Sequence, residues 1–284
     1  MSAQDATEPA LQQPQVFAPE TISQGNVYRG SFTPDDQTFF FFKNVTEGEE
    51  DYRIFRSERA NQRWTEPEQV DLGGDYSDLY PTISPDGQRM VFSSYRLVPG
   101  DTSSTRNANL WYADREGDDW GTPTFIAKAS TLPNYDAKPF FGPDGAVYFE
   151  STTPDWSRTR SLITRWDGEV YQEPEAFDDV EHWRAWRSDL HVWGGVPGPD
   201  GSFIVFDVSE RDADTGRALS SDQWISFRTQ DDRWTEPVRL GAGLNSEGYD
   251  NFTFFSADGD ELFFVRDFDR FYHIPLAAVL ERAR

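Results

Sequence analysis

YPTISPDGQRMVFSSYR, residues 80–96, holds two short apolar segments on either side of Pro-Asp-Gly. A Pro-Asp-Gly sequence between two apolar segments is typical of a tight turn that joins two antiparallel strands. One predicted hairpin says little about architecture. The same pattern, however, returns four more times along the chain.

The five hairpin patterns recur at nearly constant spacing, with turns that begin at Pro34, Pro85, Pro143, Pro199 and Ala257. A second pattern alternates with the first and is clearest in RWTEPEQV (63–70) and RWTEPVRL (233–240). Further strand-like segments lie between the two patterns. Each repeat therefore predicts four strands, which is typical of a β-propeller blade.

We accordingly predict an all-β fold, a five-bladed β-propeller that forms a single domain over residues 1–284. The predicted blades cover residues 26–72, 76–128, 134–179, 190–241 and 249–276. The last blade lacks a fourth strand, and another copy of the second pattern, DATEPALQ (5–12), lies near the N-terminus. We expect residues 5–18 to complete that blade and close the ring, which leaves no strand edge exposed. The alternative is an open β-sandwich.

The composition excludes several classes of function. The formal net charge is −24, so nucleic acid and anionic membranes would be repelled, although solubility is the simplest reason for the acidity. The chain has no cysteine, which excludes disulfides, thiolate metal ligands and a cysteine nucleophile. No apolar run is long enough to span a bilayer.

The N-terminal sequence MSAQDATEP resembles the residues that remain around a secretory cleavage site. We therefore expect a periplasmic or secreted location, with the signal peptide removed.

The turn and its flanking strand resemble a known repeat. Ser84, Pro85, Asp86, Gly87 and Phe92, together with the W-x-x-P segments, resemble the TolB-type Pro-Asp propeller repeat, a relative of the WD-repeat propellers. The resemblance covers nearly the whole chain and is weakest at residues 34–36 and 257–259. It implies the propeller fold but no single function, because relatives include periplasmic translocation proteins, lids of serine peptidases and propellers without assigned activity. We expect the turn aspartates to cap backbone N–H groups.

Propeller topology predicts where a site would lie. The loop into each innermost strand and the loop between the second and third strands lie on one face, which we call the loop face, and the Pro-Asp-Gly turns lie on the opposite turn face. The innermost strands line a central channel, where loops of several blades converge. Candidate ligand-binding residues come from counting back from each turn and from the side of the loop between the second and third strands. They are Tyr28, Arg29, Tyr80, Arg96, Tyr135, Lys138, Trp193, Asp207, Tyr249 and Arg266. The candidate catalytic residues are Asp78, Asp136, Glu150, His191 and Asp250.

Carboxylates beside aromatic side chains suit sugars, because hydroxyls take the hydrogen bonds while the ring stacks. Arg29 and Lys138 would instead hold a carboxylate on an acidic sugar or small metabolite. The alternative is that these charges neutralise one another around a wet channel. The sequence thus predicts a propeller that binds a small polar molecule, a glycan or a protein partner at its channel.

The second prediction is an enzyme, a glycoside hydrolase or lyase that acts on a carbohydrate or a carboxylate-bearing metabolite. Five-bladed glycosidases of the arabinanase type use three carboxylates around the channel, but their own sequence pattern is absent, so this is an analogy of geometry. Two flanking carboxylates can act as acid and base when they lie roughly 5–9 Å apart. His191 or His182 is an alternative general base, although their spacing does not suit zinc.

We expect no cofactor, with a divalent cation such as calcium as the alternative. Asp207, Asp212, Asp214 and Thr215 bring together oxygen ligands of the kind that Ca²⁺ prefers, but they lack the EF-hand pattern. A solvated loop is the simpler interpretation of these residues.

Overall fold

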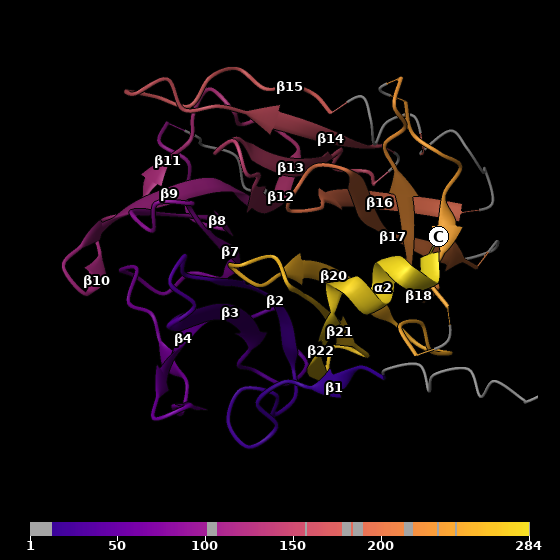
Figure 1. Cartoon of the computed structure of the whole chain (residues 1–284). Coiled ribbons are helices and arrows are strands. Elements are labelled where there is room, and N and C mark those ends of the chain that lie inside the picture. The colour runs from indigo at the N-terminus through magenta and orange to yellow at the C-terminus, as the bar shows by residue number, and fades with distance from the viewer. Residues whose placement is uncertain are drawn as a thin grey trace, which may run out of the picture.

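The computed structural model describes residues 13–100, 107–156, 158–177, 183, 190–212, 218–231, 233–241 and 243–283. These residues form five small antiparallel sheets that stand around a common axis as a five-bladed β-propeller (Figure 1). The fold predicted from the repeats is therefore confirmed. No helix among the described residues is long and apolar enough to cross a membrane.

The five blades share one plan, in which three long strands are followed by short outer strands. The first blade contains β2 (Val27–Phe32), β3 (Thr38–Asn44), β4 (Tyr52–Ala60), β5 (Arg63–Trp64) and β6 (Glu68–Gln69). The second contains β7 (Asp78–Ile83), β8 (Arg89–Ser94), β9 (Asn109–Glu116), β10 (Asp119–Trp120) and β11 (Thr124–Phe125). The third contains β12 (Tyr135–Phe141), β13 (Val147–Thr152), β14 (Thr159–Thr164) and β15 (Glu175–Ala176). The fourth contains β16 (Leu190–Pro197), β17 (Phe203–Arg211), β18 (Ala218–Phe227) and β19 (Val238–Arg239).

The last blade combines both ends of the chain. It contains β20 (Asp250–Phe255), β21 (Glu261–Arg266), β22 (Arg270–Pro275) and the N-terminal strand β1 (Gln15–Val16), which pairs antiparallel with β22. The next residue, Phe17, donates its N–H to the carbonyl of Phe271 at 2.9 Å. The ring is thus closed by the N-terminal strand, as predicted, whereas DATEPALQ (5–12) lies outside the described residues.

The first blade shows how the sequence packs one blade against the next. Its strand β3 reads TFFFFKN, and alternate side chains of a strand point to opposite faces. Phe40 and Phe42 join a cluster with buried side chains of the second blade, whereas Phe39 and Phe41 join a cluster with those of the last blade. Burying each ring stabilises the fold by about 1.5–3 kcal/mol. A run of apolar residues is required because both faces of the sheet are covered.

The Pro-Asp-Gly turns are held by their aspartates. Asp86 Oδ1 accepts hydrogen bonds from Ser84 Oγ at 2.5 Å and from the Gln88 N–H at 3.0 Å. Asp35 and Asp258 make equivalent bonds in other blades. These bonds lower the pKa of Asp86 below its usual value. The predicted capping role of the turn aspartate is confirmed.

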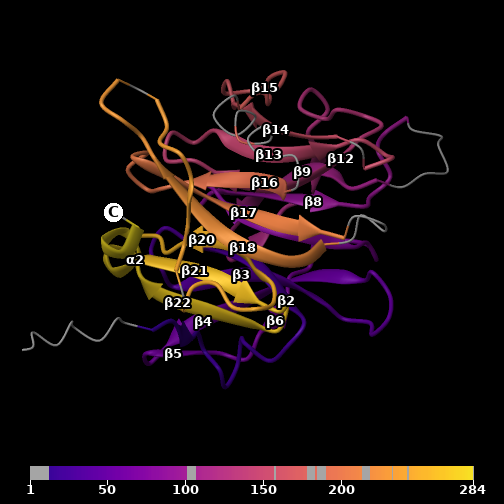
Figure 2. The same ribbon diagram turned by 90° about the vertical axis from the view of Figure 1, so that its right-hand side faces the viewer.

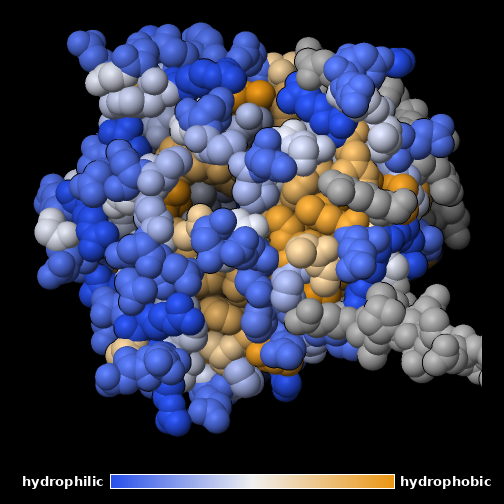
Figure 3. Space-filling view, in the orientation of Figure 1, coloured by the Kyte–Doolittle hydropathy of each residue, from blue (hydrophilic) through white to orange (hydrophobic). Residues whose placement is uncertain are grey.

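The helix α2 (Leu276–Ala283) follows β22 on the turn face. The Leu276 N–H donates to the carbonyl of Asp260, in the turn of the last blade, at 2.7 Å. Leu276 and Val279 are buried in a cluster with side chains of the fourth and last blades. Figure 2 shows α2 at one end of these strands, and Figure 3 shows a hollow with hydrophobic side chains near the middle of the face that carries it.

Every innermost strand carries a bulge at the same point, and this feature positions the site. The register with the second strand shifts between Val27 and Gly30, Leu79 and Thr82, Ala137 and Phe140, Val192 and Gly195, and Asn251 and Phe254. Three bulge residues have left-handed backbones, with φ of 53° at Tyr80, 56° at Lys138 and 58° at Phe252. A bulge redirects the side chains beside it. We refer to residues 29, 80, 138, 194 and 252 as the bulge positions.

Candidate ligand-binding site in the central channel

Two connected chambers occupy the channel near the loop face. The outer chamber has a volume of about 230 Å³, and aromatic side chains of four blades and of nearby loops line it with Lys138, Glu150 and Asp207. The inner chamber, of about 20 Å³, lies deeper and is lined by Arg29 as well. Both chambers are lined by Lys138, Glu150, Asp207 and Phe252, so a ligand in the outer chamber lies next to the inner one.

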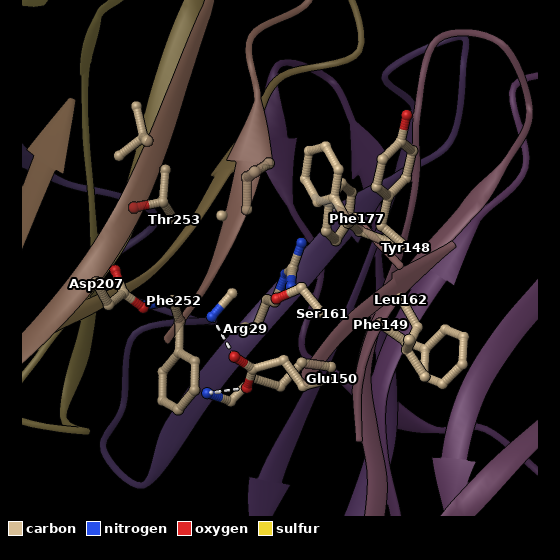
Figure 4. Close-up of a pocket in the computed structure, with 16 residues that line it drawn as sticks. Arg29, Tyr148, Phe149, Glu150, Ser161, Leu162, Phe177, Asp207, Phe252 and Thr253 are labelled. Atoms are coloured by element: carbon tan, nitrogen blue, oxygen red, sulfur yellow. Dashed lines mark hydrogen bonds and ion pairs between the residues drawn. The ribbon is translucent and has the colours of Figure 1, made fainter. Parts of the chain in front are cut away.

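Glu150 is fixed between two neighbouring blades. It lies on β13, is 5% exposed, and its Oε2 forms an ion pair with Lys138 Nζ at 2.9 Å. Its Oε1 accepts a hydrogen bond from the Gly194 N–H, and Figure 4 marks both contacts with dashed lines. A Cβ atom on residue 194 would lie 2.9 Å from Glu150 Cγ, which is too close for any residue but glycine. Gly194 therefore allows Glu150 to enter the channel.

Lys138 is held by charge and by an aromatic face. Its Nζ lies 4.2 Å from the ring centroid of Trp193, which belongs to the neighbouring fourth blade. The same Nζ forms the ion pair with Glu150. A cation over an indole ring is attracted by the negative face of the π system. The bulge at Lys138 thus places its ammonium group beside the carboxylate of Glu150 and the ring of Trp193, and both stabilise the positive charge.

Asp207 is buried with only part of its hydrogen-bonding capacity used. It is 9% exposed, and its Oδ2 accepts a hydrogen bond from the Phe252 N–H at 3.0 Å. Its Oδ1 has no hydrogen-bond partner among the described residues. Burial raises the pKa of Asp207 to about 6, against the opposing effect of nearby Lys138. The carboxyl can therefore hold or release a proton close to neutral pH.

Arg29 is the deepest cation of the site. It is 7% exposed, and its guanidinium lies over the ring of Phe140, with 5.1 Å from Cζ to the ring centroid. Within the part of the protein that the structure describes, this guanidinium has no hydrogen bond and no carboxylate within 4.0 Å. Burial lowers its pKa to about 10, so Arg29 remains charged at neutral pH. Figure 4 shows its side chain extending from β2 into the pocket.

Aromatic side chains form two walls of the outer chamber. Tyr135 and Trp156 come from the third blade, with ring centroids 5.5 Å apart, and Tyr249 and Phe268 come from the last blade, with centroids 5.3 Å apart. Trp156 is 57% exposed and has a left-handed backbone, with φ of 57°. An exposed tryptophan on a strained backbone at a pocket mouth is typical of a binding surface.

The structure brings together some of the candidates from the sequence and leaves others apart. Those that line the chambers are Arg29, Tyr80, Tyr135, Lys138, Glu150, Trp193, Asp207 and Tyr249. Tyr28 lines neither chamber and instead stacks on Phe42, with centroids 4.9 Å apart. His191 also lies outside both chambers, with its ring 4.2 Å from that of Trp193.

Asp78, Asp136 and Asp250 do not reach the chambers, because each is bonded within its own blade. Arg96 forms an ion pair with Asp78 and donates to the carbonyl of Leu72 at 2.8 Å. Arg266 repeats this arrangement in the last blade.

In that blade, Arg266 Nε lies 2.6 Å from Asp250 Oδ1, and its Nη2 donates to the carbonyl of Gly243 at 3.1 Å. In the third blade, Asp136 Oδ1 accepts from Thr131 Oγ1 at 2.6 Å. Counting back from the turns placed these aspartates beside the channel, but the bulge lies between them and the turn and shifts the side-chain direction.

The turn spacing also points to Gly194 and Phe252, five residues before their turns, but sequence reasoning did not include them among the candidate site residues. It missed Trp156 and Phe268. Trp156 and Phe268 lie in loops, where no regular spacing points to the channel.

The metal and histidine predictions are only partly covered by the structure. His182, Asp214 and Thr215 lie outside the described residues, so the calcium site remains a prediction. Among the residues that are described, no group of three or more His, Asp or Glu side chains is arranged to hold a metal ion.

Comparisons with known proteins support the fold. No known family model matches this protein, and no curated protein matches it either. The structure is similar to that of a BT0996 complex with RGII, with 13% identity and a TM-score of 0.56 over 93% of this protein and 90% of the other. It is also similar to a glycoside hydrolase, with 12% identity and a TM-score of 0.56 over the same shares of the two proteins.

A third similarity is to a protein provisionally named TolB from Agrobacterium tumefaciens, with 18% identity and a TM-score of 0.42 over 89% of this protein and 91% of the other. At these identities the first two similarities indicate the propeller fold alone. The assignment of the repeat to the TolB type remains a prediction.

Proposed function

We propose that this protein binds a small, carbohydrate-like polar ligand in the outer chamber of its channel. The observation that carries the proposal is the meeting of aromatic walls with Lys138, Glu150 and Asp207 in one cavity of about 230 Å³. Pockets for drug-sized molecules are usually about 300–1,000 Å³. The smaller volume favours a ligand of one or two rings.

The two kinds of side chain have separate tasks in this proposal. The exposed ring of Trp156, beside Tyr135, offers a flat face on which the apolar side of a sugar can stack. Lys138, Glu150 and Asp207 then face hydroxyl groups with donors and acceptors of known direction. A periplasmic or secreted location and a protein partner at the central channel remain expectations from the sequence.

A second candidate function, cleavage of a glycosidic bond, is supported by the unlike environments of the two channel carboxyls. Burial raises the pKa of Asp207 to about 6, whereas Glu150 is ion-paired with Lys138. A protonated and an ionised carboxyl group in one pocket is the arrangement that glycosidases use for acid and base or nucleophile. Asp207 would be the acid in this scheme.

The binding proposal is tested by titrating neutral and acidic mono- and disaccharides into the protein by calorimetry. Trp156→Ala should weaken the binding of any sugar that binds by about 2- to 10-fold, which is the usual contribution of one aromatic contact. The folded protein should keep its stability, because Trp156 is largely exposed. Leu97→Ala is the matched control, since Leu97 is 55% exposed and lines neither chamber. Equal affinity of both variants for the bound sugar would contradict the proposal.

Catalysis is tested separately with Asp207→Asn. If the protein cleaves a glycoside, this change should abolish turnover of the sugars that bind, while leaving their affinity within a few-fold. If Asp207→Asn leaves turnover unchanged, Asp207 is not the acid. If wild-type protein binds a sugar glycoside and never cleaves it, the binding function stands alone.

A further inference from the structure

We infer that the ligand carries a carboxylate, and that Arg29 in the inner chamber, with Lys138 beside it, binds this group. The inference deepens the proposed function and rests on it, because it assigns a chemical class to the ligand of the outer chamber. The argument depends on the buried Arg29, Glu150 and Asp207, on the partly buried Lys138, and on the size of the space between them.

Arg29 is a buried cation that forms no hydrogen bond and no ion pair with the described residues. Its guanidinium lines the inner chamber, contacts the face of Phe140, and has no ion pair or hydrogen bond within the described ranges. A buried cation is costly unless an anion and hydrogen-bond acceptors replace the water that it has lost. In contrast Arg96, which is buried to a similar extent, is paired with Asp78.

The carboxyl groups of the site do not supply the missing partner. Glu150 is engaged by Lys138 and by the Gly194 N–H. Asp207 lies more than 4.0 Å from the guanidinium of Arg29 and so forms no ion pair with it. With a pKa of about 6, Asp207 is mostly ionised at neutral pH and offsets the charge of Arg29 from a distance. The guanidinium therefore lacks a hydrogen-bond acceptor among the described residues rather than a counter-charge.

The small volume of the inner chamber favours a carboxylate over a larger anion. A volume of about 20 Å³ is close to that needed for a single water-sized group, which is about 10–15 Å³. A planar carboxylate also matches the planar guanidinium, which can donate two parallel hydrogen bonds to it. A polyanion is disfavoured further by the net charge of −24.

The two chambers have walls in common, so one molecule can occupy both. Lys138, Glu150, Asp207 and Phe252 line each of them, and Arg29 closes the inner end. A ring that stacks on Trp156 can therefore extend one substituent inward. Arg29 also lines a cavity of about 320 Å³ that opens on the turn face, so a free small acid has a second route to the same guanidinium.

The experiment uses matched pairs of sugars that differ only in a carboxylate, namely glucuronate with glucose and galacturonate with galactose, and their disaccharides. Calorimetry should show at least one acid bound about 10-fold or more tightly than its neutral partner, as one charge-assisted bidentate contact would give. Arg29→Met should abolish this preference, so that the acid and its neutral partner bind with similar affinity. Arg29→Lys, which keeps the charge without the planar fork, should retain part of the preference.

Acetate, which has the carboxylate and no ring, tests the anion site by itself. It should raise the unfolding temperature of the wild type and not that of Arg29→Met, and the unliganded Met variant should be at least as stable as the wild type because an unpaired buried cation is removed. Sulfate and phosphate are the controls. Equal stabilisation by these anions would overturn the assignment to a carboxylate.

The outcomes separate the inference from the function on which it rests. Sugars bound without preference for the acid, together with no effect of acetate, would overturn the inference and leave the proposed function intact. Stabilisation by acetate that depends on Arg29, with no sugar bound, would support the anion site and overturn the proposed carbohydrate function. No response to either probe would overturn both.

Discussion

Two regions of this propeller bury charged side chains, and they differ in whether these side chains have a bonding partner. At the start of the innermost strands, Asp78 and Asp250 are each paired with an arginine of the same blade. In the channel, Arg29 and one oxygen of Asp207 are buried without such a partner among the described residues. The first arrangement completes the bonding of the fold, whereas the second leaves bonding capacity open to a ligand.

Repetition distinguishes the two regions. The aspartate–arginine pair recurs in the second and last blades, and in both the arginine also binds carbonyl groups of the incoming loop. The bulge positions, in contrast, carry a different residue in every blade. In a repeat protein, a side-chain arrangement that recurs in several repeats is expected to stabilise the repeat itself. A side chain that occurs only once at a repeated backbone position is the better candidate for a functional residue.

Among the substitutions that test this comparison, Asp250→Ala should cause the largest loss of unfolding free energy. It removes a fully buried carboxylate and leaves Arg266 and the Ser246 hydroxyl without their acceptor. Removing one partner of a buried ion pair usually costs about 3–5 kcal/mol. Urea unfolding should show a loss of that size, and a loss below about 1 kcal/mol would mean that the pair is not structural.

Asp207→Asn should affect the pH dependence of stability instead. The pKa of Asp207 in the folded protein is about 6, above the value of about 3.9 for an exposed aspartate, so the folded state holds the proton more tightly than the unfolded state. The carboxyl therefore favours folding most at low pH, and this contribution is lost as the pH rises from about 4 through 6.

Relative to Asp207→Asn, the wild type should lose up to about 3 kcal/mol of unfolding free energy between pH 4 and 7, since each unit of pKa shift corresponds to about 1.4 kcal/mol. Denaturant titrations at several pH values measure both proteins. Parallel pH profiles would show that Asp207 is not buried in the way described.

Gly194→Ala should have a smaller effect on stability and a clear one on the site. The added methyl group meets Glu150 at 2.9 Å, and accommodating such overpacking typically costs about 1–3 kcal/mol. Glu150 must move, so ligand affinity should fall even where the fold is kept. Gly241→Ala is the control, since nothing lies within 4 Å of its added Cβ. Unchanged affinity in Gly194→Ala would remove Glu150 from the site.

The smallest effect is expected for Asp222→Asn. Asp222 accepts two hydrogen bonds from Arg239 at 2.8 Å, but the arginine side chain is 48% exposed. Exposed ion pairs usually contribute less than about 1 kcal/mol. Thermal unfolding should therefore barely change, and a loss comparable with that of Asp250→Ala would erase the distinction between exposed and buried pairs.

The sequence was sufficient for the fold because the turn chemistry repeats. Pro-Asp-Gly at regular spacing predicts the hairpins, and the four consecutive phenylalanines of residues 39–42 fit a sheet that is covered on both faces. It was sufficient for part of the site, since Arg29 and Lys138 lie five residues before their turns. It placed Asp78 and Asp250 wrongly relative to the chambers, because side-chain alternation cannot reveal a bulge. Trp156 was missed because its loop has no periodicity.

The repeated bulge has a consequence for how this protein could change its specificity. The backbone, rather than the neighbouring side chains, sets the direction of residues 29, 80, 138, 194 and 252. Gly194 has no room for a larger side chain, and Tyr80 and Phe252 also pack in a core cluster. Arg29 and Lys138 are therefore the positions at which single exchanges would change the interior of the ring with the least effect on the sheets, and a library of these two codons would sample new selectivity on the same scaffold.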